Sequence, residues 1–513
     1  MIHPSKKEFL EKSKRGNLIP VVKEILADFE TPVSAYLKMA QGDFSFLLES
    51  VEGNERIGRY SFLGSSPRWV FSNRGRDVTF QEGKKVKRYQ VEGNPLDELK
   101  KYLKDYQVVR DERLPRFFGG AVGYIGYGMV NFFDGIHQKN FNDLNLPDMC
   151  FIFADTLIAF DHVEHRLKMI ANAFIKEGTR PEVSYEEALK RIHRVERQLS
   201  SPKKLKPIEW SDESKFLKLG KLKSNVSQKF FEKNVERAKE YIRAGDVFQV
   251  VLSQRFSIQE RLDPVLLYRV LRSINPSPYM FLLKMNNFHL VGTSPEILVR
   301  CEEGRVEVRP IAGTRPRGKD PEEDKDLEKQ LLEDPKERAE HLMLVDLGRN
   351  DVGRVSKFGS VEVPERMVIE KYSHVIHIVS DVVGKLAQGK DAFDVLKAAF
   401  PAGTVTGAPK IRAMQIIEEL ENIHRGPYAG AIGYFSFSGD LDSCITIRTL
   451  LLKDGMIYLQ AGAGIVADSI PEKEYQETLN KAKGMLKAVE ITKKVQSLTP
   501  LFNGARVQRK NKN

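Results

Sequence analysis

The chain has 513 residues, too many for one simple core and enough for two subdomains or one large layered domain. Hydrophobic residues make up 41% of it and charged residues 29%, which is typical of a globular protein and excludes a disordered or fibrous one. The formal net charge of +11 favours anionic ligands. Basic and aromatic residues do not cluster on one element, so the sequence does not predict a nucleic-acid partner.

The sequence carries no recognisable membrane or export signal. Its N-terminal residues lack the apolar core of a signal peptide, and no segment reaches the roughly 18 apolar residues of a membrane span. Three cysteines, Cys150, Cys301 and Cys444, form no CxxC pair, which favours buried strand thiols over a disulfide framework or a zinc site. We therefore expect a cytoplasmic enzyme without membrane association.

Changes in residue composition and hydrophobic pattern along the chain predict two structured regions. Residues 18–176 hold short apolar runs broken by glycine or charge, which predict strands, and residues 200–225 are rich in Lys, Ser and Pro, which predicts a linker. In residues 226–492 amphipathic helices alternate with strands joined by short turns, and residues 503–513 form a basic tail. Short turns between strands favour antiparallel sheets with covering helices, an α+β fold.

Residues 305–320 and 334–348 form the first group of candidate site elements. A strand runs into Gly313-Thr314, where we predict a turn, and a helix follows with Asp334 as N-cap, Glu337 completing a capping box and Gly348 as its stop. The predicted apolar stripe of this helix leaves Glu340 beside it. A solvated acidic face is the alternative interpretation of that glutamate.

The second group lies near the C-terminus. Residues 443–452 predict one strand that carries Arg448, whose planar fork suits a carboxylate, although a structural ion pair is the alternative. In the next strand Gly462-Ala463-Gly464 predict either a bulge or the close approach of a ligand or backbone. A helix is predicted to begin after Ser469, which forms a capping box with Glu472. This helix carries Glu474 and Glu477 one turn apart, and their carboxylate oxygens are ligands that suit magnesium.

Several motifs taken together resemble the chorismate-utilising enzymes, and most closely those that make anthranilate. They are RPIAGTRPRG, AEHLMLVDLGRND, YSHVIHIVSDV, PAGTVTGAPK, GPYAGAIGYFS, ITIRT and QAGAGIVADSIPEKEYQET. The resemblance spans nearly the whole chain. It implies an α/β sandwich of two stacked antiparallel sheets with flanking helices, chorismate and ammonia as substrates, and pyruvate as the second product.

The resemblance also assigns roles to residues of this chain. It implies that Glu340 and Glu477 hold Mg²⁺, with Glu474 and Lys481 close by. Chorismate contacts are implied for Gly313, Thr314, Tyr428, Arg448, Gly462, Ala463 and Gly464. Glu296 matches the family's general acid, because hydroxide is a poor leaving group that needs a proton. His377 matches the histidine of proton transfer, with His374 as an alternative to it.

Two positions predict the product. Relatives that add water have a lysine base where this chain has Gln249. The alternative function is 4-amino-4-deoxychorismate synthesis, and many relatives that make this product have a lysine where this chain has Ala312. Both residues favour anthranilate. None of the three cysteines has the glycine-flanked turn of a glutaminase nucleophile, so ammonia is expected from a separate glutamine amidotransferase subunit.

The resemblance further implies feedback inhibition by tryptophan at a site in the N-terminal region. The matching elements are LLES, with Ser50, and NPSPYM, with Pro278, Tyr279 and Met280. Ordinary strand and turn structure is the alternative interpretation of these segments.

Overall fold

Two large antiparallel sheets form the centre of the molecule in a computed structural model that describes residues 2–50, 58–202, 221–372 and 375–498. The first sheet contains, in spatial order, β1 (Ile2–His3), β2 (Leu18–Leu26), β11 (Arg166–Phe174), β10 (Thr156–Asp161), β4 (Tyr60–Ser65), β3 (Phe44–Glu49), β14 (Tyr279–Met285), β15 (Phe288–Ser294), β24 (Thr449–Lys453), β25 (Met456–Ile465), β13 (Gln249–Gln259) and β12 (Lys223–Ser224), with β21 (Gly407–Ala408) paired to β13.

The second sheet lies against the first. Its strands, in spatial order, are β18 (Ile311–Pro316), β20 (Val375–Lys385), β17 (Arg305–Val308), β16 (Ile297–Glu302), β23 (Leu441–Ile445), β22 (Ala431–Ser436), β8 (Gly120–Ile125), β9 (Met149–Ala154), β5 (Trp69–Arg74), β6 (Asp77–Glu82) and β7 (Lys85–Gln90), with β19 (Glu362–Lys371) paired to β20. Aromatic and aliphatic side chains such as Phe46, Phe117 and Tyr434 fill the space between the sheets.

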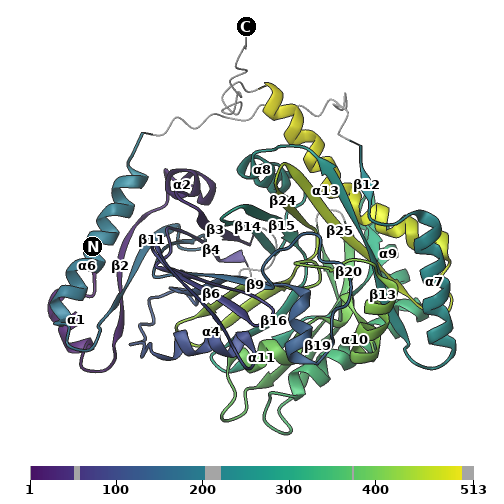
Figure 1. Cartoon of the computed structure of the whole chain (residues 1–513), viewed down its shortest axis with the longest axis horizontal. Coiled ribbons are helices and arrows are strands. Elements are labelled where there is room, and N and C mark those ends of the chain that lie inside the picture. The colour runs from purple at the N-terminus through teal and green to yellow at the C-terminus, as the bar shows by residue number, and fades with distance from the viewer. Residues whose placement is uncertain (1, 51–57, 203–220, 373–374, 499–513) are drawn as a thin grey trace.

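Helices cover the outer faces, so the layers are helix, sheet, sheet, helix (Figure 1). Against the first sheet pack α1 (Lys6–Lys12), α2 (Pro32–Met39), α6 (Pro181–Leu199), α7 (Gln228–Arg243), α8 (Pro264–Ile274), α12 (Lys410–Leu420) and α13 (Pro471–Leu498). On the second lie α4 (Pro95–Lys104), α9 (Pro321–Glu333), α10 (Pro335–Gly353) and α11 (Ala392–Ala399). Short turns η1 (Tyr127–Met129), α5 (Val130–Phe133) and η2 (Gly403–Val405) complete the helical elements that the described residues form.

This architecture confirms the predicted sandwich of mainly antiparallel sheets. Strands from both predicted regions share each sheet, because β3 pairs with β14 in the first and β8 pairs with β22 in the second. The division into regions at 18–176 and 226–492 stays a prediction. Most of the predicted linker and the whole of the predicted tail at 503–513 lie outside the described residues. No helix in the described part of the chain is long and apolar enough to cross a membrane.

The chain passes from one sheet to the other within the predicted Arg448 strand, so the prediction of one strand over residues 443–452 was wrong. β23 ends at Ile445 in the second sheet, and β24 begins at Thr449 in the first. Arg448 lies in the crossover with a φ of 49°. A second crossover joins β15 to β16 and contains Glu296. The alternating apolar pattern continues through the change of sheet, so periodicity alone does not reveal the crossover.

Other local predictions also need correction. Gly313 lies within β18 at a register shift, with a φ of 68°, so the predicted turn is a β-bulge. Gly348 packs against Val308 inside α10, which continues to Gly353. Glu337 pairs with Arg315 instead of closing a capping box. The hydroxyl of Ser469 accepts from the N–H of Val466, so it does not cap α13, and that helix extends past residue 492 to Leu498.

Candidate active site

A cavity of about 650 Å³ lies beside the two crossovers, a size within the range of small-molecule sites. Its walls come from β13, β18, β20, β25, α10 and α13 together with both crossovers. The predicted site residues that line it are Glu296, Gly313, Thr314, Glu340, His377, Tyr428, Arg448, Gly462, Gly464, Glu474, Glu477 and Lys481. The fold therefore gathers side chains that lie far apart in the sequence around one space.

Arg448 supplies a half-buried positive charge to this cavity. Its Nη1 donates to the carbonyl of Lys481 (3.1 Å), and in the described part of the chain no carboxylate lies within ion-pair distance of it. Burial lowers the pKa of Arg448. A partly desolvated guanidinium without a carboxylate partner is stabilised by a ligand that supplies the anion. This favours the predicted substrate contact over a structural ion pair.

The glycines of β25 let neighbouring side chains approach the strand closely. The alternative of a bulge is wrong because β25 pairs with β13 without a register shift. A Cβ on Gly462 would lie 2.7 Å from the hydroxyl of Tyr428, and one on Gly464 would lie 2.6 Å from Nε2 of Gln249. Ala463 alternates with them, and its side chain packs into an apolar cluster with Val250 instead of lining the cavity.

Backbone groups of the same strand face the cavity. Nζ of Lys481 donates to the carbonyl of Gly462 (3.0 Å), so this carbonyl points away from β13. Alternate residues of a strand direct their backbone groups to the same edge, so the N–H groups of Gly462 and Gly464 lie along that edge as well. β24 pairs with β25 only over Met456 to Leu459, which leaves this part of the edge without a strand. Such an edge can bind an anionic oxygen.

Carboxylates from α10 and α13 meet across the cavity. Nε2 of Gln249 donates to Oε1 of Glu340 (3.2 Å), and Glu477 pairs with Lys481 (2.7 Å). Burial raises the pKa of Glu340, the hydrogen bond from Gln249 opposes the shift, and the nearby charge of Glu477 adds to it. Burial likewise raises the pKa of Glu474. Partly buried carboxylates that repel one another favour a cation between them.

The donor set fits a magnesium ion that is only partly bound by protein. Among the described residues no three His, Cys, Asp or Glu side chains converge as a complete metal site. Mg²⁺ typically uses one or two carboxylates and completes its octahedron with water and substrate oxygens. Glu340 and Glu477 are the carboxylates predicted for it, and Glu337 is paired with Arg315.

Glu296 is a buried carboxyl group with the properties of an acid. Its side chain is 8% exposed, and its position on the crossover is held by a hydrogen bond from the N–H of Ile445 to its carbonyl (3.0 Å). Burial raises the pKa of Glu296 to about 8, against the opposing effects of Thr404 and Lys481. The group is therefore protonated at neutral pH and can give a proton to a leaving group.

His377 is arranged as a base. Nδ1 lies 2.8 Å from the carbonyl of Gly313, to which it donates, so Nε2 is left as the acceptor in the neutral ring. Burial lowers the pKa of His377, the hydrogen bond to Gly313 opposes this, and the charge of Arg448 adds to it. His377 is thus satisfied at one ring nitrogen and keeps the other for proton transfer. His374 lies outside the described residues.

Two further cavity residues were missed in the sequence. Lys336 lies one turn before Glu340 on α10, and this spacing could have placed it on the same face. Thr404 lies in η2 and contacts the cavity beside Glu296. It belongs to the PAGTVTGAPK motif, but the spacing of a loop does not indicate which side chain points inward.

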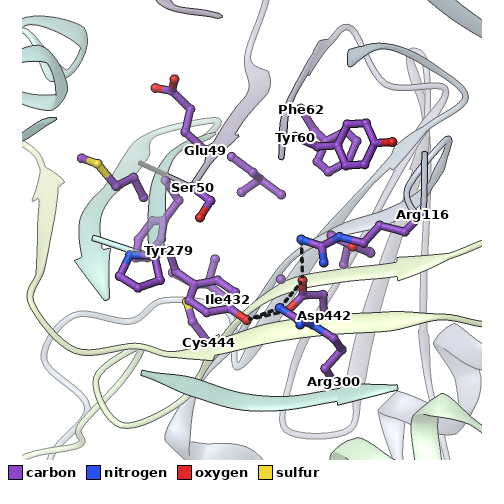
Figure 2. Close-up of a pocket in the computed structure, with 16 residues that line it drawn as sticks. Glu49, Ser50, Tyr60, Phe62, Arg116, Tyr279, Arg300, Ile432, Asp442 and Cys444 are labelled. Atoms are coloured by element: carbon purple, nitrogen blue, oxygen red, sulfur yellow. Dashed lines mark hydrogen bonds and ion pairs between the residues drawn. The ribbon is translucent and has the colours of Figure 1, made fainter. Parts of the chain in front are cut away.

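The residues predicted to bind tryptophan line a second, smaller cavity of about 50 Å³ between the sheets (Figure 2). Ser50, Pro278, Tyr279 and Met280 all contribute to it. The hydroxyl of Tyr279 donates to Asp442 (2.8 Å), which also pairs with Arg116 (3.3 Å) and Arg300 (3.4 Å). Tyr60, Phe62 and Tyr434 add aromatic surface.

Polar atoms in this smaller cavity lack partners. Oγ of Ser50 and Nε of both Arg116 and Arg300 are buried without a hydrogen bond. Unsatisfied donors beside aromatic walls suit a small ligand that is aromatic at one end and polar at the other. The lining residues come from both predicted regions, so the cavity is not confined to the N-terminal one.

Comparison with known proteins agrees with this geometry. A sequence profile of the chorismate binding enzyme family matches residues 44–487, and the chain belongs to this family. It is 47% identical over 497 residues to anthranilate synthase component 1 of Acetivibrio thermocellus, covering 96% of this chain and 99% of that protein. It is 49% identical over 495 residues to anthranilate synthase component 1 of Aquifex aeolicus, covering 96% and 99%.

A solved structure shares the fold. The crystal structure of anthranilate synthase component I from Streptococcus pneumoniae TIGR4 superposes with a TM-score of 0.73 at 39% sequence identity, covering 90% of this chain and 98% of that chain.

Proposed function

We propose that the chain converts chorismate and ammonia to anthranilate, pyruvate and water, in the first step of tryptophan biosynthesis. The observation that carries this proposal is the joint placement of a protonated acid, Glu296, a neutral base, His377, and a spare guanidinium, Arg448, around one cavity. The names of the relatives, each an anthranilate synthase component 1, support it.

Binding of the dianionic substrate uses Arg448, the hydroxyl of Thr314 and the free N–H groups of Gly462 and Gly464. Planar guanidinium groups and backbone N–H edges are the partners that carboxylates prefer. Glu340 and Glu477 would hold Mg²⁺, which when bound supplies the positive charge that offsets a substrate carboxylate near these glutamates. The raised pKa of Glu340 supports the need for a cation there.

Proton transfer uses the two titratable groups. The carboxyl of Glu296 gives its proton to the hydroxyl that leaves the ring as ammonia adds, so the leaving group departs as water, and the added nitrogen loses one proton to become the amine. In the second step the ring carbon that bears the new amine loses its proton, the ring becomes aromatic, and the enolpyruvate that leaves gains one proton on its methylene carbon to give pyruvate. Nε2 of His377 is the acceptor for that proton, because Nδ1 keeps its own proton in the hydrogen bond to Gly313.

The product is set by groups that the site lacks. Gln249 offers no base to activate water, and Ala312 offers no amine to the ring, and both residues line the cavity. Ammonia is a sufficient nucleophile without a base. The alternative of 4-amino-4-deoxychorismate synthesis is not favoured by these residues or by the names of the relatives.

Ammonia is expected from a glutamine amidotransferase partner. All three cysteines are buried, and burial raises the pKa of Cys150 to about 12 and that of Cys301 to about 11. Burial also raises the pKa of Cys444. A glutaminase needs an accessible thiolate, so these thiols cannot serve as its nucleophile. The designation of the relatives as component 1 supports a second component.

Tryptophan is proposed as a feedback inhibitor that binds the smaller cavity. The unpartnered hydroxyl of Ser50 lines it and could bind the amino group, and the aromatic walls could enclose the indole. The cavity of about 50 Å³ must widen to admit an indole ring. Met280, an unbranched side chain, is suited to such an adjustment. A cytoplasmic location belongs to the same proposal for a biosynthetic enzyme.

The test uses the purified chain with chorismate. With an ammonium salt at alkaline pH, we expect anthranilate and pyruvate in equal amounts, separated by chromatography. With glutamine in place of ammonium we expect essentially no product until the partner is added. Isochorismate or 4-amino-4-deoxychorismate as the main product would overturn the assignment. Glutamine-dependent turnover by a preparation demonstrably free of partner would overturn the need for a second subunit.

A further inference from the structure

Glu296 lines the large cavity and also a third cavity behind it, the rear cavity. The rear cavity measures about 40 Å³, and Glu296, Leu344 and Thr404 line both spaces. Beyond these shared residues, the rear cavity is lined by Arg309, Leu347, Asp351, Ala399 and Ala402, none of which touches the large cavity. Glu296 therefore borders both the proposed substrate space and a space beyond it.

The rear cavity is polar enough to hold water. Asp351 accepts from Nζ of Lys410 (2.8 Å), and Arg309 lies at the same cavity. The hydroxyl of Thr404 borders both spaces beside the carboxyl of Glu296, whose pKa burial raises and this hydroxyl lowers. A water needs roughly 10–15 Å³ and two or more polar partners, so the volume admits water, and Glu296, Arg309 and Asp351 are polar groups at its wall.

The outer wall of the rear cavity reaches toward solvent. The side chains of Arg309 and Asp351 are 17% and 13% exposed, whereas Glu296 as a residue is only 8% exposed. Ala402, Gly403 and Thr404 are half-buried along the same wall. When substrate occupies the large cavity, Glu296 is covered on that side. Of the two spaces that Glu296 lines, the rear cavity is then the one that substrate leaves open.

Turnover creates a need that this arrangement meets. If Glu296 is the acid of the proposed function, on which this inference rests, each turnover breaks its O–H bond and leaves a carboxylate and a new water molecule inside a closed site. The nitrogen that adds to the ring loses one proton in the same turnover, so before the next turnover the site must return one proton to the carboxylate and release one water molecule. We propose that the rear cavity is the path by which the released water leaves and by which Glu296 exchanges its proton with solvent.

The test separates the first turnover from those that follow. Ala399→Val narrows the rear cavity from the end of α11 without altering any polar group. The matched control is Ala398→Val, the preceding buried alanine of the same helix, which does not line the cavity. Ala402→Val is a second variant, which narrows the rear cavity at the residue that precedes η2.

Rapid mixing of enzyme with chorismate and ammonium gives both rates. Glu296 starts protonated, so we expect the first-turnover rate to be the same in all variants. The steady-state rate should fall several-fold in Ala399→Val and Ala402→Val but not in Ala398→Val, so that a burst of product appears or grows, with kcat/KM for chorismate unchanged. The solvent deuterium isotope effect on the steady state should rise in the same two variants.

Other results would overturn the proposal. Equal slowing of the first and later turnovers, or a ratio of the two rates that matches the Ala398→Val control, would mean that the cavity only supports packing. Thermal unfolding of each variant checks that the fold is retained. Failure of the proposed function is distinguishable, because it appears as absence of anthranilate from the unaltered chain or as full activity of Glu296→Gln.

Discussion

Gln249 and Glu340 are joined across the candidate active site, where Nε2 of the amide donates to Oε1 of the carboxylate over 3.2 Å. The amide also lies against β25, where a Cβ on Gly464 would meet it at 2.6 Å. Gln249 is thus fixed on one side by a glycine and on the other by a carboxylate proposed to hold a metal. A change at this position should affect both the nucleophile and the metal.

Gln249→Lys tests this relationship. An ammonium group beside Glu340 should compete with Mg²⁺, and we expect activation by Mg²⁺ to weaken roughly tenfold, about 1.4 kcal/mol. The neutral amine fraction should also let water compete with ammonia, giving some isochorismate. Magnesium titration and product chromatography measure the two effects. Gln249→Met, which removes the hydrogen bond without a charge, is the control, and an identical Mg²⁺ response in both variants would contradict the prediction.

Removal of the metal or of its proposed ligand should abolish most activity. Chelation with EDTA, or Glu340→Gln, is expected to reduce anthranilate formation on the order of a hundredfold, about 2.7 kcal/mol, because substrate and glutamates then repel each other. Added Mg²⁺ should restore the chelated enzyme but not the variant. Glu337→Gln is the matched control, because Glu337 borders the same cavity but pairs with Arg315. Full activity in EDTA would exclude the metal.

The pH dependence of the reaction should report the acid. Glu296 must be protonated to act, and burial raises its pKa to about 8. At a fixed concentration of free ammonia, we expect the turnover rate to fall as pH rises above about 8. Bound substrate can displace this midpoint, but a rate that keeps rising through pH 9 at constant free ammonia would rule out an acid of this kind.

The same carboxyl group should lower stability at alkaline pH. Its pKa in the folded state, about 8, exceeds the ordinary 4.5, so between these values the folded chain keeps a proton that the unfolded chain has lost. The contribution of this group to the free energy of unfolding therefore falls as pH rises, by up to about 1.4 kcal/mol per pH unit, and levels off above 8. Glu296→Gln should lack this slope. Denaturant unfolding of both proteins from pH 5 to 8 measures the difference, and parallel curves would contradict it.

A buried ion pair behind the cavity wall should be important for stability. Arg425 donates to Glu421 (2.6 Å) and to the carbonyls of Val251 (2.8 Å) and Val405 (2.7 Å). Arg425→Met leaves Glu421 buried and unpaired, which should cost about 3–5 kcal/mol. Adding Glu421→Gln removes the charge and should recover a large part of that loss. Urea unfolding measures both, and a double variant no more stable than the single one would refute this account.

Tryptophan inhibition should depend on the smaller cavity and not on the active site. Ser50→Phe places a ring where the indole is proposed to bind, so inhibition should be lost while the kcat and KM for chorismate stay close to those of the unaltered chain. Ser50→Ala, which removes only the unpartnered hydroxyl, should weaken inhibition less. Activity titrated with tryptophan measures both. Unchanged inhibition in Ser50→Phe would place the inhibitor elsewhere.

The sequence predicted the composition of the large cavity better than its architecture. Glu340, Glu477 and Arg448 were candidates because a charge beside an apolar pattern is locally visible, the resemblance assigned their roles, and all three line the cavity. The crossovers were missed because Ile445 and Thr449 continue one alternating pattern although they lie in different sheets. A change of sheet is set by tertiary pairing, which local periodicity does not record.

Helix ends and loop residues were the least predictable features. Gly348 looks like a stop but is a contact point, where the absent side chain lets α10 lie against Val308. Thr404 and the rear cavity have no local signal, because they depend on how η2 packs beside Glu296. Such features require the distances between elements that are remote in the sequence.

The shared sheets have a consequence for how the chain acquires its structure. During synthesis β3 and β8 are complete well before β14 and β22, the strands that pair with them, have been made. Until then each presents an edge of unpaired backbone groups and apolar side chains such as Leu47, which in the finished protein lies opposite Leu282. Long-range pairing of this kind slows folding and prolongs exposure to aggregation. The nascent chain should therefore depend on chaperones until its last strands emerge.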